Sequence, residues 1–131
     1  MPADYAAMSD AELVRAYAER VCGWRIVSFD DEDRCGGVFP RLVENINRDW
    51  VLMREAHVGS LFSPLTSDSD LFLGVDAMTK FGWSIGIRYG SVQKFWTVLF
   101  KRRATMYEYW HLDRRRAVMI AALLACEGKC R

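Results

Sequence analysis

The sequence predicts an α+β fold, in which an antiparallel sheet of three or more strands lies between helical layers in a single domain over residues 1–131. Two patterns predict it. Ala117 to Cys126 is a run of ten residues without a polar side chain, which is typical of a helix buried around most of its circumference. Residues 95–100 are apolar at every position but one, which is typical of a middle strand covered above and below.

The first predicted helix follows a frayed N-terminus over residues 1–8. Ser9 and Glu12 have the spacing of a capping box, in which each side chain satisfies a backbone N–H of the first turn. Apolar residues at helical spacing come next, and Gly23 is placed to end the helix. We therefore expect an amphipathic helix between Ser9 and Gly23.

The segment after this helix predicts a short edge strand over residues 24–29 and then an acidic loop over residues 30–37. Alternating carboxylates before a glycine resemble the start of a calcium loop. Counting from Asp31, however, the twelfth position is Leu42, where such a loop needs a bidentate glutamate. We interpret the loop as solvated.

A second helix is predicted after a region of mixed pattern. Residues 41–57 fit a short helix and a strand equally well, and the sequence leaves this choice open. Ser67 and Asp70 are spaced as a helix cap and its partner. Gly82 is placed to end the second helix.

The C-terminal part of the sequence predicts three strands and a closing helix. The strands are expected over residues 83–89, 94–101 and 104–110. Gly90 and Ser91 suit a two-residue hairpin turn. Asp113 is placed to cap a helix from Arg114 to Glu127, and Gly128 to end it.

Charge is divided unequally along the chain. Residues 1–78 hold 14 acidic against 7 basic side chains, and residues 79–131 hold 3 against 11. The halves could neutralise each other within the fold, or the basic half could present a surface to an anionic partner. Both interpretations stay open on charge alone.

Cysteine and histidine spacing argues against a metal centre. The cysteines stand at positions 22, 35, 126 and 130, and we expect free thiols because no secretory signal is apparent. His57 and His111 belong to no ligand pair. Since no apolar run is long enough to span a membrane, we expect a protein of the cytoplasm with no metal and no cofactor.

The order of these segments resembles the phage ABA sandwich domain family of small bacteriophage and prophage proteins. The resemblance covers about a third of the chain and rests on residues 9–24, 62–78 and 116–125. Residues 25–61 depart from it, because they are longer than the usual connection. The resemblance implies an α+β sandwich and an accessory protein that acts on the host or its defences, and it implies no settled enzymatic activity.

Three arginines at the start of the closing helix point to an anion site. Arg114, Arg115 and Arg116 occupy the first turn, where the helix dipole disfavours cations by about 0.3–1 kcal/mol each. Free N–H groups and guanidinium groups at such a helix end can hold phosphate or carboxylate. Acids of the N-terminal half could instead supply the counter-charge within the fold.

Sheet topology adds further basic residues to this site. The end of the third strand should lie beside the start of the second, near the turn that follows Arg88. We define basic patch 1 as Arg88, Lys94, His111, Arg114, Arg115 and Arg116. Basic patch 2 comprises Lys101, Arg102 and Arg103, about 23 Å away along the strands. Aromatic residues at strand spacing, such as Trp96 and Trp110, are interpreted as core.

The sequence thus favours a noncatalytic phage or prophage binding protein, an inhibitor of host defence or a host-takeover factor. Its partner would be a host protein or protein complex, with a nucleotide or nucleic acid as another anionic partner. One alternative is a small enzyme acting on a nucleotide or nucleic acid through His57 or His111. Another is an oligomeric structural protein, and a homodimer is compatible with each hypothesis.

Overall fold

The computed structural model describes residues 5–27, 40–45, 47, 49–55 and 58–129. The acidic loop predicted at 30–37 lies outside the described residues, as does His57. None of the described helices is both long and apolar enough to cross a membrane.

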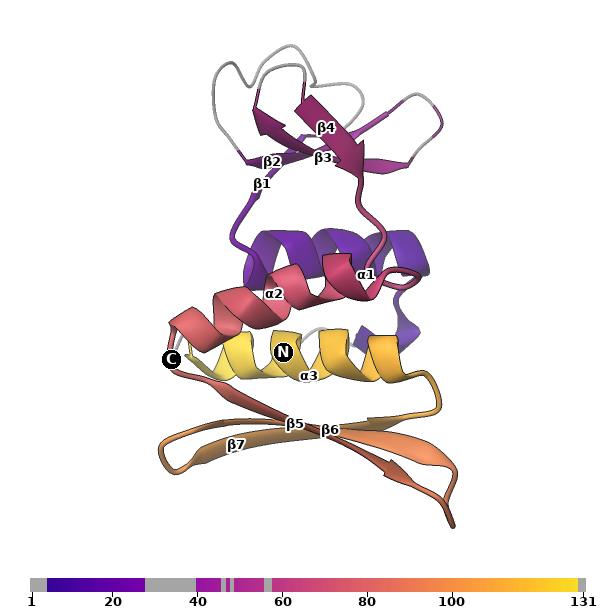
Figure 1. Cartoon of the computed structure of the whole chain (residues 1–131), viewed down its shortest axis with the longest axis vertical. Coiled ribbons are helices and arrows are strands. Elements are labelled where there is room, and N and C mark those ends of the chain that lie inside the picture. The colour runs from indigo at the N-terminus through magenta and orange to yellow at the C-terminus, as the bar shows by residue number, and fades with distance from the viewer. Residues whose placement is uncertain (1–4, 28–39, 46, 48, 56–57, 130–131) are drawn as a thin grey trace.

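The described residues form three α-helices between two separate sheets (Figure 1). The helices are α1 (Asp10–Ala16), α2 (Asp68–Lys80) and α3 (Arg114–Lys129). A four-stranded sheet lies beyond α1 and α2, and a three-stranded sheet packs on α3 (Figure 1). The α+β fold class is confirmed, but the layers differ from the prediction, because the helices are the inner layers and the sheets the outer ones.

The first helix begins and ends where the sequence predicts. The Ser9 hydroxyl accepts from the Glu12 N–H at 3.3 Å and the Glu12 carboxylate accepts from the Ser9 N–H at 3.3 Å, which completes the capping box. After Ala16 the helix continues as a π-helical turn, Tyr17–Val21, and Gly23 follows with a φ of 76°. The N-terminus is ordered earlier than predicted, because a 3-10 turn at Tyr5–Ala7 buries Tyr5 in the core.

The region that the sequence left open between helix and strand is a hairpin. Its strands are β2 (Arg41–Glu44) and β3 (Trp50–Glu55), flanked by β1 (Arg25–Val27) and β4 (Val58–Leu61) in the order β1-β2-β3-β4. β1 is the predicted edge strand and runs parallel to β2. The rings of Trp24 and Phe62, which flank the sheet in sequence, meet edge to face at 5.1 Å.

The second helix also follows its local signals. The Ser67 hydroxyl accepts from the Asp70 N–H at 3.3 Å. Leu71, Val75 and Met78 are buried, as their spacing predicts. Gly82 ends the helix region with a φ of 92°, a conformation that glycine adopts without strain.

The three-stranded sheet is the predicted antiparallel meander, in the order β5-β6-β7. Its strands are β5 (Ser84–Gly90), β6 (Phe95–Arg102) and β7 (Thr105–His111). The first turn is longer than predicted: Gly90 pairs with Phe95, so four residues connect the strands, and Lys94 takes a φ of 59°.

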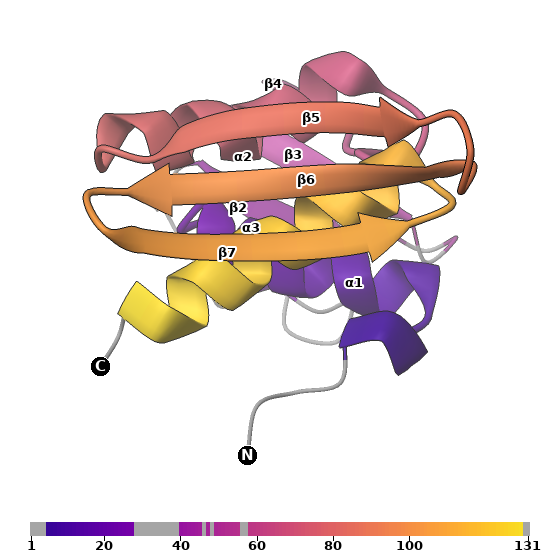
Figure 2. The same cartoon turned by 90° about the horizontal axis from the view of Figure 1, so that it is seen from below.

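Strand β6 is covered on one face only. Val98 and Phe100 point inward and are fully buried against the helices. Thr97 and Leu99 point to the opposite face, which none of the described helices covers (Figure 2). The prediction of cover on both faces was wrong, because β5 places Arg88 beside Thr97 and β7 places Glu108 beside Leu99 on this face of the sheet.

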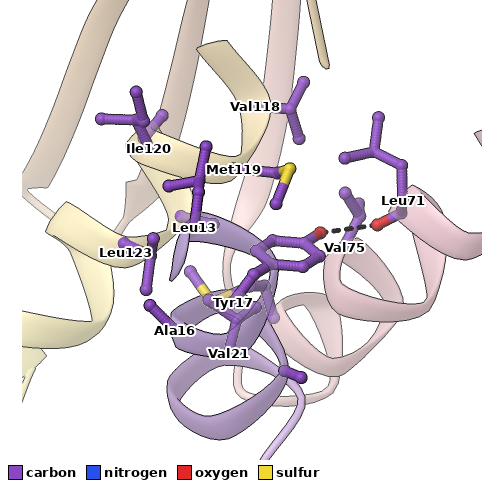
Figure 3. Packing of buried hydrophobic residues seen from close by; sticks show 14 of the residues in the cluster. Leu13, Ala16, Tyr17, Val21, Leu71, Val75, Val118, Met119, Ile120 and Leu123 are labelled. Carbon is purple, nitrogen blue, oxygen red and sulfur yellow. Dashed lines mark hydrogen bonds between the residues drawn. The ribbon is translucent and has the colours of Figure 1, made fainter. Parts of the chain in front are cut away.

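The closing helix is the centre of the core, as its apolar run predicts. Eight of the nine residues from Ala117 to Ala125 are buried, and Leu124 is half-buried. Figure 3 shows α3 packed against Tyr17 and residues of α2; the Tyr17 hydroxyl donates to the Leu71 carbonyl oxygen at 2.6 Å. The helix runs to Lys129, so Gly128 lies within its last turn and does not end it.

Candidate functional site

The anion site expected at the start of α3 is filled by the protein's own carboxylate. One carboxylate oxygen of Asp113 accepts from the backbone N–H of Arg115 at 2.9 Å and of Arg116 at 3.3 Å. Asp113 is therefore the predicted helix cap. A carboxylate in this position satisfies the free N–H groups and the positive helix end that would otherwise attract an external anion.

The three arginines also find partners within the fold. Asp68 accepts from Arg114 Nη2 at 2.7 and 3.0 Å and from Arg115 Nε at 3.0 Å. Arg116 Nη1 donates to Asp10 at 2.5 Å. The three positive charges face three negative ones, counting Asp113, so acids of the chain supply the counter-charge. The structure thus corrects the expectation that the start of this helix is an open anion-binding site.

The remaining members of basic patch 1 do not lie together. Arg88 pairs with Thr97, and His111 pairs with Trp96, one residue away on β6. Adjacent residues of a strand point to opposite faces, so Arg88 and His111 lie on opposite faces of the sheet. His111 Nδ1 accepts from the Asp113 N–H at 2.8 Å, and Lys94 lies in the turn before β6.

Basic patch 2 lies at the other end of the sheet, as predicted, but its side chains diverge. Arg102 turns inward, where its guanidinium lies 4.6 Å from the centre of the Trp83 ring and donates to the Phe81 carbonyl at 3.3 Å. Lys101 is exposed on the opposite face, and Arg103 takes a φ of 55° in the turn. An open hollow of about 550 Å³ lies here, lined by Phe81, Gly82, Arg102, Arg103 and Thr105.

The uncovered face of the three-stranded sheet carries the surface that sequence reasoning missed. We call it the outer face and define it by Arg88, Phe95, Thr97, Leu99, Lys101, Met106, Glu108 and Trp110. Phe95 and Trp110 stack with ring centres 5.3 Å apart and planes 18° apart. Trp110 is 58% exposed and Met106 59% exposed. Figure 2 looks directly onto this face.

Opposite charges flank two hollows on the outer face. One hollow, of about 280 Å³, lies beside the Phe95–Trp110 stack, and the other, of about 190 Å³, lies over Leu99. Arg88 and Glu108 line both hollows. Neither side chain forms an ion pair with any residue that the structure describes. Glu108 accepts a hydrogen bond from Trp110 Nε1 at 2.8 Å, which fixes the indole on the sheet.

The signal for this face was present in the sequence of β7. Tyr107 and Tyr109 alternate with Met106, Glu108 and Trp110. A glutamate in the second set marks a face that meets water or a partner, since an unpaired charge is costly to bury. Trp110 and Phe95 thus belong to the exposed side, whereas Trp96 contacts Tyr89 on the inner side.

The described residues offer little reactive chemistry. Within the described part of the chain, no three His, Cys, Asp or Glu side chains are grouped to hold a metal ion. Burial, with the Cys126 thiol nearby, raises the pKa of Cys22 to about 12, so this thiol stays protonated at neutral pH.

Comparison of the chain with protein-family models, curated proteins and solved structures found no match.

Proposed function

We propose that this chain is a noncatalytic binding protein that holds an acidic protein partner against the outer face. The observation that carries the proposal is the outer face of β5, β6 and β7, on which Trp110 and Met106 are exposed and Arg88 has no ion pair with a described residue. A large aromatic side chain held in place by a hydrogen bond and a stacked neighbour is the usual anchor of a protein interface.

Charge supports an acidic partner. The segment that forms this sheet, residues 84–111, holds five basic residues and one acidic residue, a formal charge of +4. The arginines of α3 are neutralised by Asp68 and Asp10, whereas Arg88 and Lys101 on the outer face have no ion pair with any described residue. Unpaired charges around an apolar centre favour encounter with a surface of opposite sign.

A protein partner is favoured over single-stranded nucleic acid by two features of the outer face. Glu108 on β7 lines both of its hollows and would repel a phosphate backbone. One side of the Trp110 ring already stacks on Phe95, so that side offers no platform for a base. A folded acidic surface would bring apolar groups to the aromatic pair and a donor to Glu108.

The biological setting of the proposal comes from the resemblance to the phage ABA sandwich domain family. On that basis we propose a phage- or prophage-encoded protein that inhibits a host component, such as a defence complex, by occupying its surface in the cytoplasm. Inhibition by occupation needs no catalytic group. It requires only that the outer face is rigid and accessible, as a sheet supported from behind by α3 is.

The test is capture of a bacterial partner by the immobilised chain, with nuclease treatment in parallel. We expect Trp110→Ala to weaken binding of the captured partner at least about tenfold, as removal of an interface anchor does. Phe72→Ala is the matched control, because Phe72 is also exposed, at 40%, but lies on α2. Circular dichroism checks that both variants stay folded.

Two results would contradict the proposal. Loss of the captured material after nuclease treatment would identify a nucleic-acid partner instead of a protein. Equal binding by the Trp110→Ala variant and the parent chain would remove the outer face from the interaction, whatever the partner is.

A further inference from the structure

The free edge of β5 is a second unfilled surface, which borders the outer face and shares Arg88 with it. β5 is the terminal strand of its sheet. α3 packs mainly on β6 and β7, and α2 contacts β5. Ile87 and Tyr89 are on the helix-facing side, yet they are 38% and 48% exposed. Apolar side chains therefore reach solvent along an unpaired strand edge.

This edge lacks the usual protection against strand pairing. Proteins shield edge strands with proline, with several charges or with a covering element. β5 reads Ser-Ile-Gly-Ile-Arg-Tyr-Gly, with one charge and no proline. Seven residues of regular strand with free N–H and C=O groups form a template for another strand.

We propose that β5 pairs antiparallel with β5 of a second copy of this chain, so that two three-stranded sheets join into one of six strands. A two-fold axis at Ile87, the central residue, places Ile87 opposite itself. The same register places Ile85 opposite the second copy's Tyr89, and Gly86 opposite the second copy's Arg88. All the large apolar residues of β5 then meet on one face, where cross-strand pairs stabilise a sheet.

Charge complementarity supports this register. Gly86, Leu99 and Glu108 form one row across the sheet and line the hollow of about 190 Å³. A Cβ at Gly86 would have no atom within 4 Å, so this position is open. The second copy's Arg88 would extend over Gly86 toward Glu108, starting about 14 Å away, three strand spacings. Its guanidinium would thus approach a carboxylate that has no ion pair among the described residues.

The other edges fit a second copy less well. Full pairing of β7 with itself centres on Glu108 and places two glutamates opposite each other, which is unfavourable. β4 at the edge of the four-stranded sheet has only four residues. A contact through one strand pair is small, so the dimer should be reversible and depend on concentration.

Site-directed cross-linking tests the register directly. In the proposed dimer the two residues at position 87 have Cα atoms about 4.5–5.5 Å apart, within reach of a disulfide. The two residues at position 89 are about 14 Å apart, four residues along the strands, which is beyond reach. Mild oxidation of Ile87→Cys should give at least about ten times more covalent dimer than Tyr89→Cys on these distances. The parent chain, oxidised in parallel, shows how much covalent dimer the native cysteines form by themselves.

Sedimentation equilibrium of the reduced parent chain tests association without a cross-link. The average mass should rise from 15.1 kDa toward twice that value as concentration increases. Ile87→Lys should keep the mass at that of the monomer, whereas Met106→Lys on β7 should not. A monomer at every concentration, or equal cross-linking of the two cysteine variants, would overturn the proposal. Neither result depends on whether the outer face binds an acidic protein.

Discussion

At the scale of single residues, the packing of the core depends on Gly74, which has no side chain. The Tyr17 ring is fully buried and its hydroxyl donates to the Leu71 carbonyl. Gly74 on α2 makes room for that ring: a Cβ at position 74 would lie 2.2 Å from the Tyr17 hydroxyl oxygen and 2.3 Å from Cζ. Glycine is used here for close packing and not for its backbone freedom.

Replacing Gly74 with alanine should therefore destabilise the protein. Helix propensity alone would favour alanine by about 1 kcal/mol. Overpacking against a buried ring costs about 1–3 kcal/mol or more, because Tyr17 can move only by giving up its hydrogen bond. We expect a net loss of about 1–2 kcal/mol in the free energy of unfolding, measured by urea denaturation.

The matched control is Gly86→Ala in β5. A Cβ there meets no atom within 4 Å, so the change should stay within about 0.5 kcal/mol, as surface substitutions usually do. If Gly74→Ala stabilised the protein, helix propensity would outweigh packing at this contact, and the close approach of Tyr17 and α2 would not be a constraint.

At the scale of elements, α3 begins with three cations at the wrong end of a helix dipole and is stabilised by acids from elsewhere. Asp68 binds both Arg114 and Arg115, and it is also the first residue of α2. One carboxylate thus stands at the positive ends of two helices and beside two guanidinium groups. Its partners are partly exposed, so its effect is modest and is screened by salt.

Asp68→Asn should lower the free energy of unfolding by about 1 kcal/mol at low ionic strength, since it removes two ion pairs and a favourable charge at the start of α2. The loss should shrink at 0.5 M NaCl, where the Debye length is only a few ångströms. Urea denaturation at both salt concentrations measures it. Asp76→Asn, an exposed carboxylate farther along α2 without an ion pair among the described residues, should show neither effect.

Element boundaries were predictable where the signal is local. Ser9, Ser67 and Asp113 cap their helices through neighbouring backbone groups, and Gly23 and Gly82 take positive φ. Such signals depend on a few adjacent residues, so the sequence contains them in full. The apolar run of α3 likewise predicted a buried helix, because no surface helix lacks a polar face.

The layer order and the candidate site were not predictable in the same way. The apolar run of β6 suits a covered strand, and only its registration against Arg88 and Glu108 reveals that one face is open. The pairing of Arg116 with Asp10 joins residues 106 positions apart. Charge counts indicated that neutralisation was one possibility, but only the packing of α1 and α2 on α3 selects the partners.

At the scale of the whole molecule, a polar cluster joins the N-terminal turn to the end of the chain's last helix. The Tyr5 hydroxyl donates to the Glu127 carboxylate and accepts from Arg20 Nη1 at 2.6 Å. Burial and the hydrogen bond to Glu127 raise the pKa of Tyr5 to about 12, despite the lowering effect of Arg20. Burial likewise raises the pKa of the Tyr17 hydroxyl and of the Cys22 thiol.

These shifts predict that the fold weakens in alkali. Each group binds its proton more tightly in the folded state than in the unfolded state. Their contribution is fully present below the ordinary pKa values, near 9 for cysteine and 10 for tyrosine, and is lost as the pH rises toward about 12. Urea denaturation between pH 8 and pH 11 should show a falling free energy of unfolding.

Tyr5→Phe isolates one contribution, because it keeps the ring in the core and removes the ionisable hydroxyl. This variant should be less stable than the parent near pH 8, where it lacks the hydrogen bonds, and its stability should fall less steeply above pH 10. A parallel decline in the two proteins would mean that Tyr5 does not contribute to the alkaline transition.

The Trp24 and Phe62 rings are in contact where the chain enters and leaves the four-stranded sheet. The chain leaves the helical layers at the first ring, builds the four-stranded sheet, and re-enters at the second. The sheet is not independent of the helices, because Leu42 and Leu52 belong to the same buried core and Trp50 Nε1 donates to the Ala11 carbonyl oxygen of α1. Natural variation should therefore be restricted at these residues, which join the sheet to the helical layers.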